Sequence, residues 1–263
     1  MPFRKVKGEA PYQALAFIYN HMMSHVNYAD WVAYLQKVFE KFRHSPKNVL
    51  ETACGVGTFT SYLEENGYHI HAIDQSEMMI QVARQTNISS NTTFQIGDIR
   101  TFESERKFDT ILCLYDSMNY LSTKEDLSQA LAAMSAVMEP RGLFVFDVTT
   151  VHNSLNLYDN TEAIEETAEF LYWRRSRYLR RDRIQINEFT IFLKDGEIYR
   201  RFYEKHKQWI FSYHAVRSAI KSAGLKLVGR FHEFTLDPPE KSSLRVHYVV
   251  QKPLYLEKTP RNV

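Results

Sequence analysis

The chain has 263 residues, 44% of them hydrophobic and 24% charged, and these ordinary proportions exclude a disordered or collagen-like protein. Its 33 lysines and arginines nearly balance 31 aspartates and glutamates, so the formal charge of +2 argues against a protein built mainly to hold a polyanion but leaves a local basic site open. Cys54 and Cys113 are the two cysteines, too few for a disulfide framework, which predicts a reducing compartment.

Membrane and secretion signals are missing from the sequence pattern. No stretch approaches the roughly 18 consecutive apolar residues that a membrane-spanning helix needs. No apolar secretory core follows the basic residues Met1 to Lys5. We therefore expect a cytoplasmic protein with no membrane partner, built as one large domain or as a domain with an inserted lobe. The sequence leaves open whether it is a monomer or a homodimer.

The first three-fifths of the chain alternate between helical and strand patterns. Apolar residues recur at helical spacing from Pro11 to Phe42, with an interruption before Asp30, which we expect to cap a second helix. Five short apolar strands are predicted at 48–53, 69–74, 93–96, 108–114 and 143–148, separated by helices at 58–66, 76–85 and 124–138 and by a turn at 140–142. This alternation predicts a parallel sheet with helices on both faces, whose ligands bind at the carboxyl ends of the strands.

The remaining chain breaks this pattern with an antiparallel segment. Strands are predicted at 170–178, 183–193 and 197–209, with Asp195-Gly196 as a hairpin turn in which both residues have positive φ. A helix at 213–223 and strands at 225–234 and 244–250 follow. We predict an α/β domain formed by residues 1–160 and 211–263, with a helical lid at 1–46 and an antiparallel β insert at 161–210, which we call the lobe.

Glycines and acidic residues mark three consecutive strand ends. Gly55 and Gly57 follow the first strand, where they let the backbone turn sharply and approach a ligand. A dinucleotide-binding loop would have a third glycine where this chain has Thr60. Asp74 ends the second strand, where a carboxylate can accept both hydroxyls of a ribose, and Asp98 ends the third, where it can accept an amino proton of adenine. Together they indicate a nucleoside-containing ligand.

These residues resemble the class I S-adenosylmethionine-dependent methyltransferases. The resemblance rests on Glu51-x-Ala53-x-Gly55-x-Gly57, Asp74, Asp98-Ile99 and the strand at 108–114, and it covers about residues 47–150. Ala53 stands where that family usually has its first glycine. Further motifs at Tyr19-Asn20, 26–31, 115–121 and Glu204-x-His206-x-Gln208 resemble the bacterial small-molecule N-methyltransferase branch, which includes amino-sugar dimethyltransferases and carries a similar antiparallel insert. The resemblance implies a doubly wound, mostly parallel seven-stranded Rossmann-like sheet and S-adenosylmethionine as cofactor, without a metal.

The resemblance also implies the cofactor contacts. Glu51 and the backbone of Ala53, Cys54, Gly55 and Gly57 would hold the methionine end of the cofactor, Asp74 its ribose, and Gln75, Met79, Asp98 and Ile99 its adenine. Leu114 and Tyr115 would lie under the sulfonium, and Tyr19 and Tyr28 would close the lid.

Methyl transfer mainly requires alignment of the acceptor and exclusion of water, and an amine acceptor must be unprotonated. Tyr115, Glu204 and His206 are the catalytic candidates, because residues two apart on a strand face the same way; packing is the alternative role for a strand histidine. The candidates for binding the acceptor are Asp116, Asn119, Tyr120 and Trp173. We expect a small-molecule acceptor methylated at nitrogen or oxygen.

Two other functions stay open. No Asn/Asp-Pro-Pro-Tyr motif follows the fourth strand and no Pro-Cys dipeptide occurs, unlike in amino- and C5-methylating nucleic-acid enzymes, and neither the cysteines nor the histidines have zinc-site spacing. Six arginines nevertheless crowd the lobe, at positions 174, 175, 177, 180, 181 and 183, and could hold RNA phosphates. An RNA-modifying methyltransferase and a catalytically inactive cofactor-binding protein are therefore the alternatives, although the charge balance makes nucleic acid the less expected partner.

Overall fold

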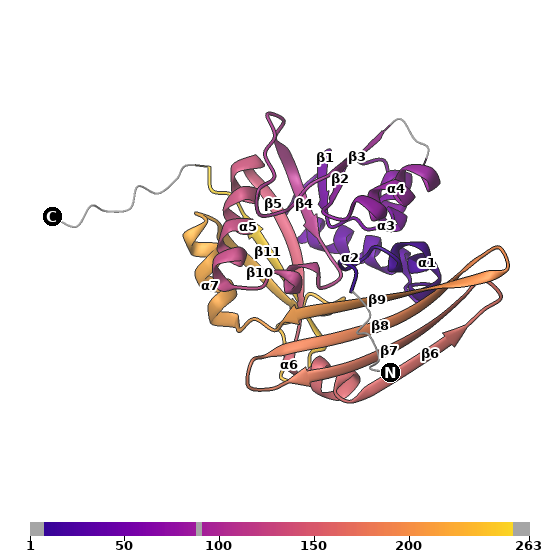
Figure 1. Ribbon diagram of the computed structural model, residues 1–263. Helices are drawn as coiled ribbons and strands as arrows, with labels where there is room; N and C mark the ends of the chain where they lie inside the picture. Colours follow the sequence, from indigo (N-terminus) through magenta and orange to yellow (C-terminus); the bar gives the residue numbers. More distant parts are fainter. Residues whose placement is uncertain (1–7, 88–90, 255–263) are drawn as a thin grey trace.

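Two β-sheets organise the protein (Figure 1). The structure is a computed structural model that describes residues 8–87 and 91–254; the ends of the predicted domain, 1–7 and 255–263, lie outside the described residues. Seven strands form the larger sheet in the order β10-β11-β5-β4-β1-β2-β3. Strands β1 to β5 pair in parallel, whereas β11 is antiparallel to both β5 and β10. The predicted seven-stranded, mostly parallel fold is confirmed.

The strands of this sheet begin and end close to the predicted residues. They are β1 (Asn48–Thr52), β2 (His69–Asp74), β3 (Thr92–Ile96), β4 (Phe108–Cys113), β5 (Met138–Thr149), β10 (Lys226–His232) and β11 (Arg245–Gln251). Strand β5 differs most. It begins at Met138, which pairs with Phe108, so the predicted turn at 140–142 lies inside the strand beside an irregularity in the β4–β5 register. A side chain at Gly142 would lie 2.8 Å from the Asp109 carbonyl oxygen, so a glycine fits this irregularity.

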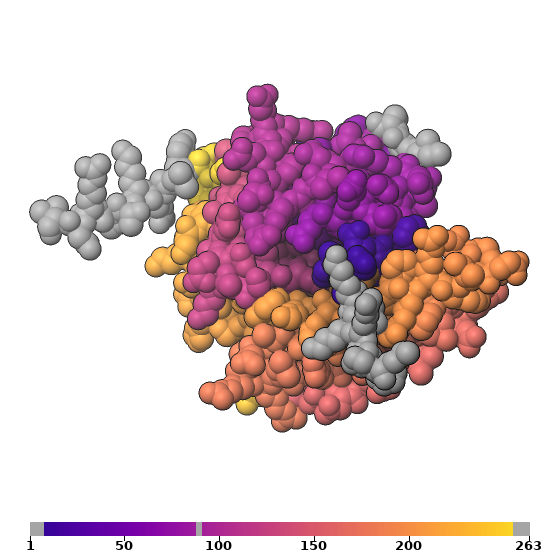
Figure 2. Space-filling model, viewed as in Figure 1, coloured from indigo at the N-terminus to yellow at the C-terminus, as the bar shows by residue number. Residues whose placement is uncertain are grey.

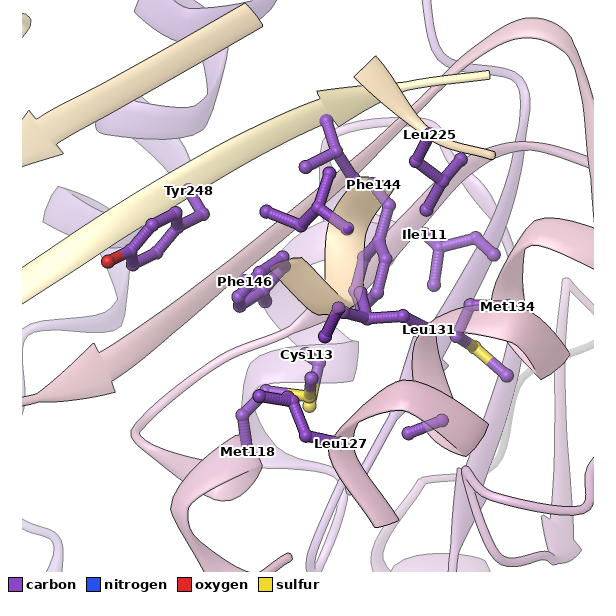
Figure 3. Close-up of a cluster of buried hydrophobic side chains, with 14 of the residues drawn as sticks. Ile111, Cys113, Met118, Leu127, Leu131, Met134, Phe144, Phe146, Leu225 and Tyr248 are labelled. Atoms are coloured by element: carbon purple, nitrogen blue, oxygen red, sulfur yellow. The ribbon is translucent and has the colours of Figure 1, made fainter. Parts of the chain in front are cut away.

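Helices cover both faces of the larger sheet because its central strands are apolar on both sides. Phe144 and Phe146 face a cluster with α5 (Lys124–Val137) and α7 (Tyr213–Ser222), whereas Leu143 and Val145 face α2 (Tyr28–Lys41) and α3 (Thr58–Glu65). In Figure 3, Leu127, Leu131 and Met134 point from α5 toward the side chains of β4 and β5. A fifth helix, α4 (Glu77–Thr86), begins after Ser76, whose hydroxyl accepts the Met79 N–H as an N-cap.

The segment before β1 is less regular than predicted. A short 3₁₀ turn, η1 (Leu15–Phe17), and one helical turn, α1 (Tyr19–Met22), precede α2. Asn27 occupies the N-cap position of α2 without a side-chain capping hydrogen bond, and the predicted cap Asp30 lies in the first turn, where a carboxylate still favours the positive end of the helix dipole. These N-terminal residues, indigo in Figure 2, lie between the core and the lobe. No helix in the described part of the chain is long and apolar enough to cross a membrane.

The smaller sheet forms the lobe and has one strand more than predicted. Its order is β6 (Thr161–Glu166), β7 (Phe170–Leu179), β8 (Ile184–Asp195) and β9 (Ile198–Trp209), all antiparallel, and β9 lies nearest the core (Figure 1). The β8–β9 hairpin also differs from the prediction. Asp195 pairs with Ile198, so Gly196 and Glu197 form the turn, and only Gly196 has positive φ, at 63°.

Candidate active site

Two connected cavities lie at the carboxyl ends of β1 to β4. The larger has a volume of about 410 Å³ and is lined from β2 and β3 by Asp74, Gln75, Met79, Asp98 and Ile99. The smaller is lined from β1 and β4 by Glu51, Ala53, Cys54, Leu114 and Tyr115 and from the lid by Tyr19 and Tyr28. Tyr19, Ala53, Gly55 and Ser117 line both cavities. The sequence-predicted cofactor residues, with the exception of Gly57, therefore line two adjoining cavities.

The loop after β1 adopts a backbone that favours glycine. Ala53, Gly55 and Gly57 all have positive φ, at 54°, 57° and 78°. A side chain at Gly57 would meet the Asn87 side-chain nitrogen at 2.6 Å, so the position has no room for one. Ala53 tolerates the left-handed conformation at a cost of order 1–3 kcal/mol. Ala53 and Gly55 line both cavities, whereas Gly57 lets the loop pack against Asn87 and Phe94.

Glu51 is a buried carboxyl at the end of the small cavity. Its side chain accepts the Thr60 hydroxyl at 2.6 Å, and the residue is 5% exposed. Burial raises the pKa of Glu51 to about 8, against the hydrogen bond from Thr60. A buried carboxyl of this kind is stabilised in its charged form by an incoming cation, such as an α-ammonium group.

Asp74 fixes the loop and lines the larger cavity at the same time. One carboxylate oxygen accepts the Gly55 N–H at 2.9 Å, and the other accepts the Ser76 N–H at 2.8 Å. Burial raises the pKa of Asp74, and these two backbone bonds oppose the rise. Each oxygen keeps a lone pair for a further donor, so the geometry fits the predicted contact with ribose hydroxyls.

Asp98 has a partner that the sequence did not reveal. The Arg100 guanidinium donates to both of its oxygens, with Nε at 3.0 Å from each, and also lies 3.4 Å from Asp126. Partial burial would raise the pKa of Asp98, but the hydrogen bonds from Arg100 hold it below its usual value. Arg100 itself lines the larger cavity. The predicted adenine contact at this carboxylate would therefore be shared with the guanidinium.

The loop after β4 is held in an unusual conformation by a buried ionic network. Tyr115 and Asp116 both have positive φ, at 62° and 52°. The Asp116 N–H donates to Asp147 at 2.7 Å, and Arg245 bridges the two carboxylates, with Asp116 at 2.7 Å. The Arg245 guanidinium also lies over the Tyr115 ring, 4.8 Å from its centre. This network places Tyr115 against the small cavity.

A third cavity of about 310 Å³ lies on the other side of Tyr115 and Trp31, which line both it and the small cavity. Its remaining walls include Asp30 of α2, Tyr158, Glu233 and Arg245. It therefore adjoins the half of the sheet formed by β5, β10 and β11, which the other two cavities leave free. Five of its lining residues, Val26, Asn27, Asp30, Trp31 and Tyr115, belong to the sequence motifs at 26–31 and 115–121, whereas the rest come from segments far apart in the chain.

Glu204 and His206 lie behind the cavity walls and not on their surface. Both are buried, with 0% and 1% exposed, and the Glu204 carboxylate accepts the His206 Nε2–H at 3.0 Å. The other ring nitrogen of His206 lies 3.0 Å from the Tyr120 hydroxyl, which accepts the Tyr12 hydroxyl at 2.6 Å. Neither side chain lines any of the three cavities. Tyr12 was not among the site residues that the sequence pattern indicated.

Three of the four predicted acceptor-binding residues, Asp116, Asn119 and Tyr120, lie in one short turn after β4, but their side chains have different surroundings. Tyr120 lines the larger cavity, and Asp116 lies in the ionic network behind Tyr115. Asn119 is fully buried, its amide donating to the Trp209 carbonyl and accepting the Thr149 N–H. Trp173 donates to Glu162 on β6 and packs against an arginine, away from the three cavities. The side chains of Asn119 and Trp173 are therefore hydrogen-bonded within the protein and do not face a cavity.

The chain is similar in sequence and in structure to known methyltransferases. Residues 49–142 match the family described as a methyltransferase domain. YqeM of Bacillus subtilis (strain 168), provisionally named a methyltransferase, is 29% identical over 92% of this chain and 97% of its own length. A dTDP-3-amino-3,6-dideoxy-alpha-D-glucopyranose N,N-dimethyltransferase of Streptomyces fradiae is 30% identical over 40% of this chain and 41% of its own. A solved S-adenosylmethionine-dependent methyltransferase from Clostridium acetobutylicum ATCC 824 is 25% identical, with a TM-score of 0.77 over 92% of this chain and 99% of its own.

Proposed function

Because the chain is a class I S-adenosylmethionine-dependent methyltransferase, we propose that it methylates a nitrogen of a small-molecule amine. The observation that carries this proposal is a group of tyrosines around the end of β4. They come from the lid, from the loop after β4 and from the segment after β5: Tyr12, Tyr19, Tyr115, Tyr120 and Tyr158. Burial raises the pKa of each, and the charge of Asp116 adds to the rise in all five, so their hydroxyls stay protonated.

A tyrosine-lined site suits an amine acceptor for an electrostatic reason. The cofactor supplies an activated methyl group, and positive charge passes to the acceptor nitrogen during the transfer. Aromatic faces attract such a cation, and buried walls exclude water that would compete with them. The chain contributes alignment and this electrostatic surrounding, which is what methyl transfer requires.

The residues of the two connected cavities fit the cofactor. Glu51 would hold its α-ammonium, Asp74 its ribose, and Met79, Ile99 and Asp98 its adenine, the last together with Arg100. Tyr19 and Tyr28 of the lid would cover it. With both cysteines buried and unpaired, we place the reaction in the reducing cytoplasm.

We assign the third cavity to the acceptor. Its volume of about 310 Å³ suits a small molecule. Its carboxylates, Asp30 and Glu233, favour a cationic acceptor. Arg245, its one arginine, is already paired with Asp116 and Asp147. The acceptor would approach the methyl group past Tyr115, with the lobe closing the site from the other side.

The lobe's arginines give little support to RNA modification. Arg177 is paired with Glu188, Arg180 with Asp159, and Arg183 donates to the Ile210 carbonyl. Arg174 and Arg175 lie over the rings of Tyr158 and Trp173. Most of the cluster is thus engaged within the protein and spread along β7 and the following turn.

Incubation with methyl-labelled cofactor tests the proposed function. We offer the enzyme a panel of small alkylamines, arylamines and alcohols, and RNA as a separate arm, and expect label to enter amines. Changing Arg180 and Arg181 to glutamine serves as the control, and should leave the turnover of the amines unchanged. If label enters RNA alone, and this labelling disappears in the variant with Arg180 and Arg181 changed, RNA modification is supported instead. If label enters none of the compounds or the RNA, the protein binds the cofactor without catalysing methyl transfer.

Replacing Asp74 with asparagine should weaken cofactor binding by roughly 1–3 kcal/mol, because a charged acceptor of ribose hydrogen bonds is lost. Calorimetry with S-adenosylmethionine measures this, and the Asp182→Asn change in an exposed turn of the lobe is the matched control. Unchanged affinity in Asp74→Asn would contradict the ribose assignment. Tight binding of a nicotinamide cofactor by the parent would contradict the cofactor assignment itself.

A further inference from the structure

The third cavity has a wall of aromatic rings. Four of the residues that line it are aromatic: Trp31, Tyr115, Tyr158 and Phe234. The ring centre of Trp31 lies 4.8 Å from that of Phe234 and 5.5 Å from that of Tyr115, so these three rings form one surface. Phe234 is 41% exposed, which leaves part of its side chain free to contact a ligand. Because aromatic faces attract cations, this wall suits a positively charged group.

The same cavity contains two carboxylates that are free to bind a cation. Asp30 lies in the first turn of α2, and Glu233 lies directly after β10. Glu233 accepts the Leu244 N–H at 3.0 Å, and neither carboxylate forms an ion pair within the part of the chain that the structure describes. The other charged or basic groups of the wall are Arg245, which two aspartates already hold, and the exposed His25. The cavity therefore offers negative charge that a ligand can balance.

Transfer of the methyl group would take place at the wall that the third cavity shares with the small cavity. Trp31 and Tyr115 line both cavities, whereas Asp30 and Glu233 line the third alone. In the proposed arrangement, the methionine end of the cofactor occupies the small cavity together with its sulfonium. The reacting nitrogen must therefore lie at Tyr115, and the carboxylates remain for another part of the acceptor.

The two environments make opposite demands on a nitrogen atom. Beside the carboxylates an amine stays protonated, because an opposite charge favours the charged form. A protonated amine has no lone pair, whereas attack on the methyl group needs an unprotonated nitrogen. One nitrogen cannot meet both demands at once, so the acceptor needs two.

We propose that the acceptor is a diamine. One nitrogen is an ammonium held by Asp30, Glu233 and the aromatic rings, and the other is uncharged and lies at Tyr115. The uncharged nitrogen uses its lone pair to form a bond to the methyl carbon, while the carbon–sulfur bond breaks and its electron pair passes to sulfur. The positive charge moves to the methylated nitrogen, which releases a proton to water on leaving the site. This inference rests on the proposed function and names the class of amine that the enzyme takes.

Matched sets of acceptors test the diamine. Each straight-chain diamine from diaminopropane to diaminohexane is compared, with methyl-labelled cofactor, with the alkylamine and the ω-amino acid of the same carbon number. We expect kcat/KM of the best diamine to exceed that of its alkylamine by at least about tenfold, because a charge-assisted contact is gained. The amino acid should be the poorest acceptor of each set, since its carboxylate meets Asp30 and Glu233.

Neutral variants of both carboxylates link this preference to the cavity. In the double variant of Asp30→Asn and Glu233→Gln, the ratio of diamine to alkylamine should fall to about one, and each single change should lower it by a smaller factor. The amide in Glu233→Gln can still accept the Leu244 N–H. Asp30→Asn also removes a charge that stabilises the start of α2, but this effect acts equally on both amines and leaves their ratio unchanged.

Glu40→Gln is the matched control, because it removes an exposed carboxylate near the other end of α2, away from the three cavities. It should keep the ratio of the parent, and calorimetry with S-adenosylhomocysteine shows whether each variant keeps its fold. A parent that methylates alkylamines as fast as diamines overturns the diamine and leaves the proposed function standing, and so does a preference that survives in the double variant. A parent that methylates no amine overturns the proposed function and the diamine with it.

Discussion

Changing Arg245 to leucine should lower the free energy of unfolding at pH 8 by roughly 3–5 kcal/mol, the largest effect expected of any single change discussed for this protein. The guanidinium lies between Asp116 and Asp147, and the Asp147 side chain has no exposed surface. Without Arg245, two carboxylates stay in the interior with no cation beside them. Urea unfolding followed by circular dichroism measures the difference.

The effect of Arg245→Leu should depend on pH in a defined direction. Burial raises the pKa of Asp116 and of Asp147, and Arg245 opposes the rise in both. In the variant these pKa values rise further, so the folded state binds protons that the unfolded chain does not. The variant should therefore gain stability relative to the parent as the pH falls from 8 toward 5.

Two further variants make this expectation specific. Arg200 forms an exposed ion pair with Asp195, and Arg200→Leu should cost no more than roughly 1 kcal/mol. Adding Asp147→Asn to Arg245→Leu should restore part of the lost stability, because one unpaired charge is removed while the amide oxygen can still accept the Asp116 N–H. Equal losses in Arg245→Leu and Arg200→Leu, or a loss that does not vary with pH, would contradict the buried network.

The parallel part of the sheet could be predicted from sequence because its strands are apolar on both faces. In β5, Phe144 and Phe146 face one helical layer and Leu143 and Val145 the other, so an unbroken apolar run marks the strand. Strand β6 carried no such signal. Strand β6 has the sequence Thr-Glu-Ala-Ile-Glu-Glu and lies at the edge of the lobe. Charged residues on an edge strand disfavour pairing with other chains, but they also hide the strand pattern, so β6 is recognised only by its pairing with β7.

The cofactor residues could be predicted for a related reason. Glu51 and Asp74 lie at the carboxyl ends of β1 and β2, and Gly55 follows β1, so position along the chain determines position in the site. Tyr12 could not be predicted in this way. It follows no strand, it lies in a turn ahead of the predicted helical segment's first ordered element, and its place is determined by Glu204, 192 residues away in the chain. The third cavity is similar, since Asp30, Tyr158 and Glu233 meet only through the fold.

Cofactor binding should be coupled to the release of a proton from Glu51. Its pKa of about 8 means that the carboxyl is mostly protonated in the free protein at pH 7. The α-ammonium of the cofactor favours the charged carboxylate and lowers this pKa, so binding should release up to about one proton at pH 7. Affinity should therefore rise with pH, by up to about tenfold per unit below pH 7.5, and level off near pH 8.

Calorimetry with S-adenosylhomocysteine in phosphate and in Tris buffer measures the released proton directly, because the two buffers differ in their heat of protonation. Glu51→Gln supplies the matched variant, since an amide can still accept the Thr60 hydroxyl but cannot titrate. We expect no proton release in Glu51→Gln, affinity near that of the parent at pH 6, and much weaker binding than the parent at pH 8, where the parent gains the charge. A parent that releases no proton would mean that the ammonium lies elsewhere, and that the buried carboxyl at the end of β1 serves the fold through Thr60 alone.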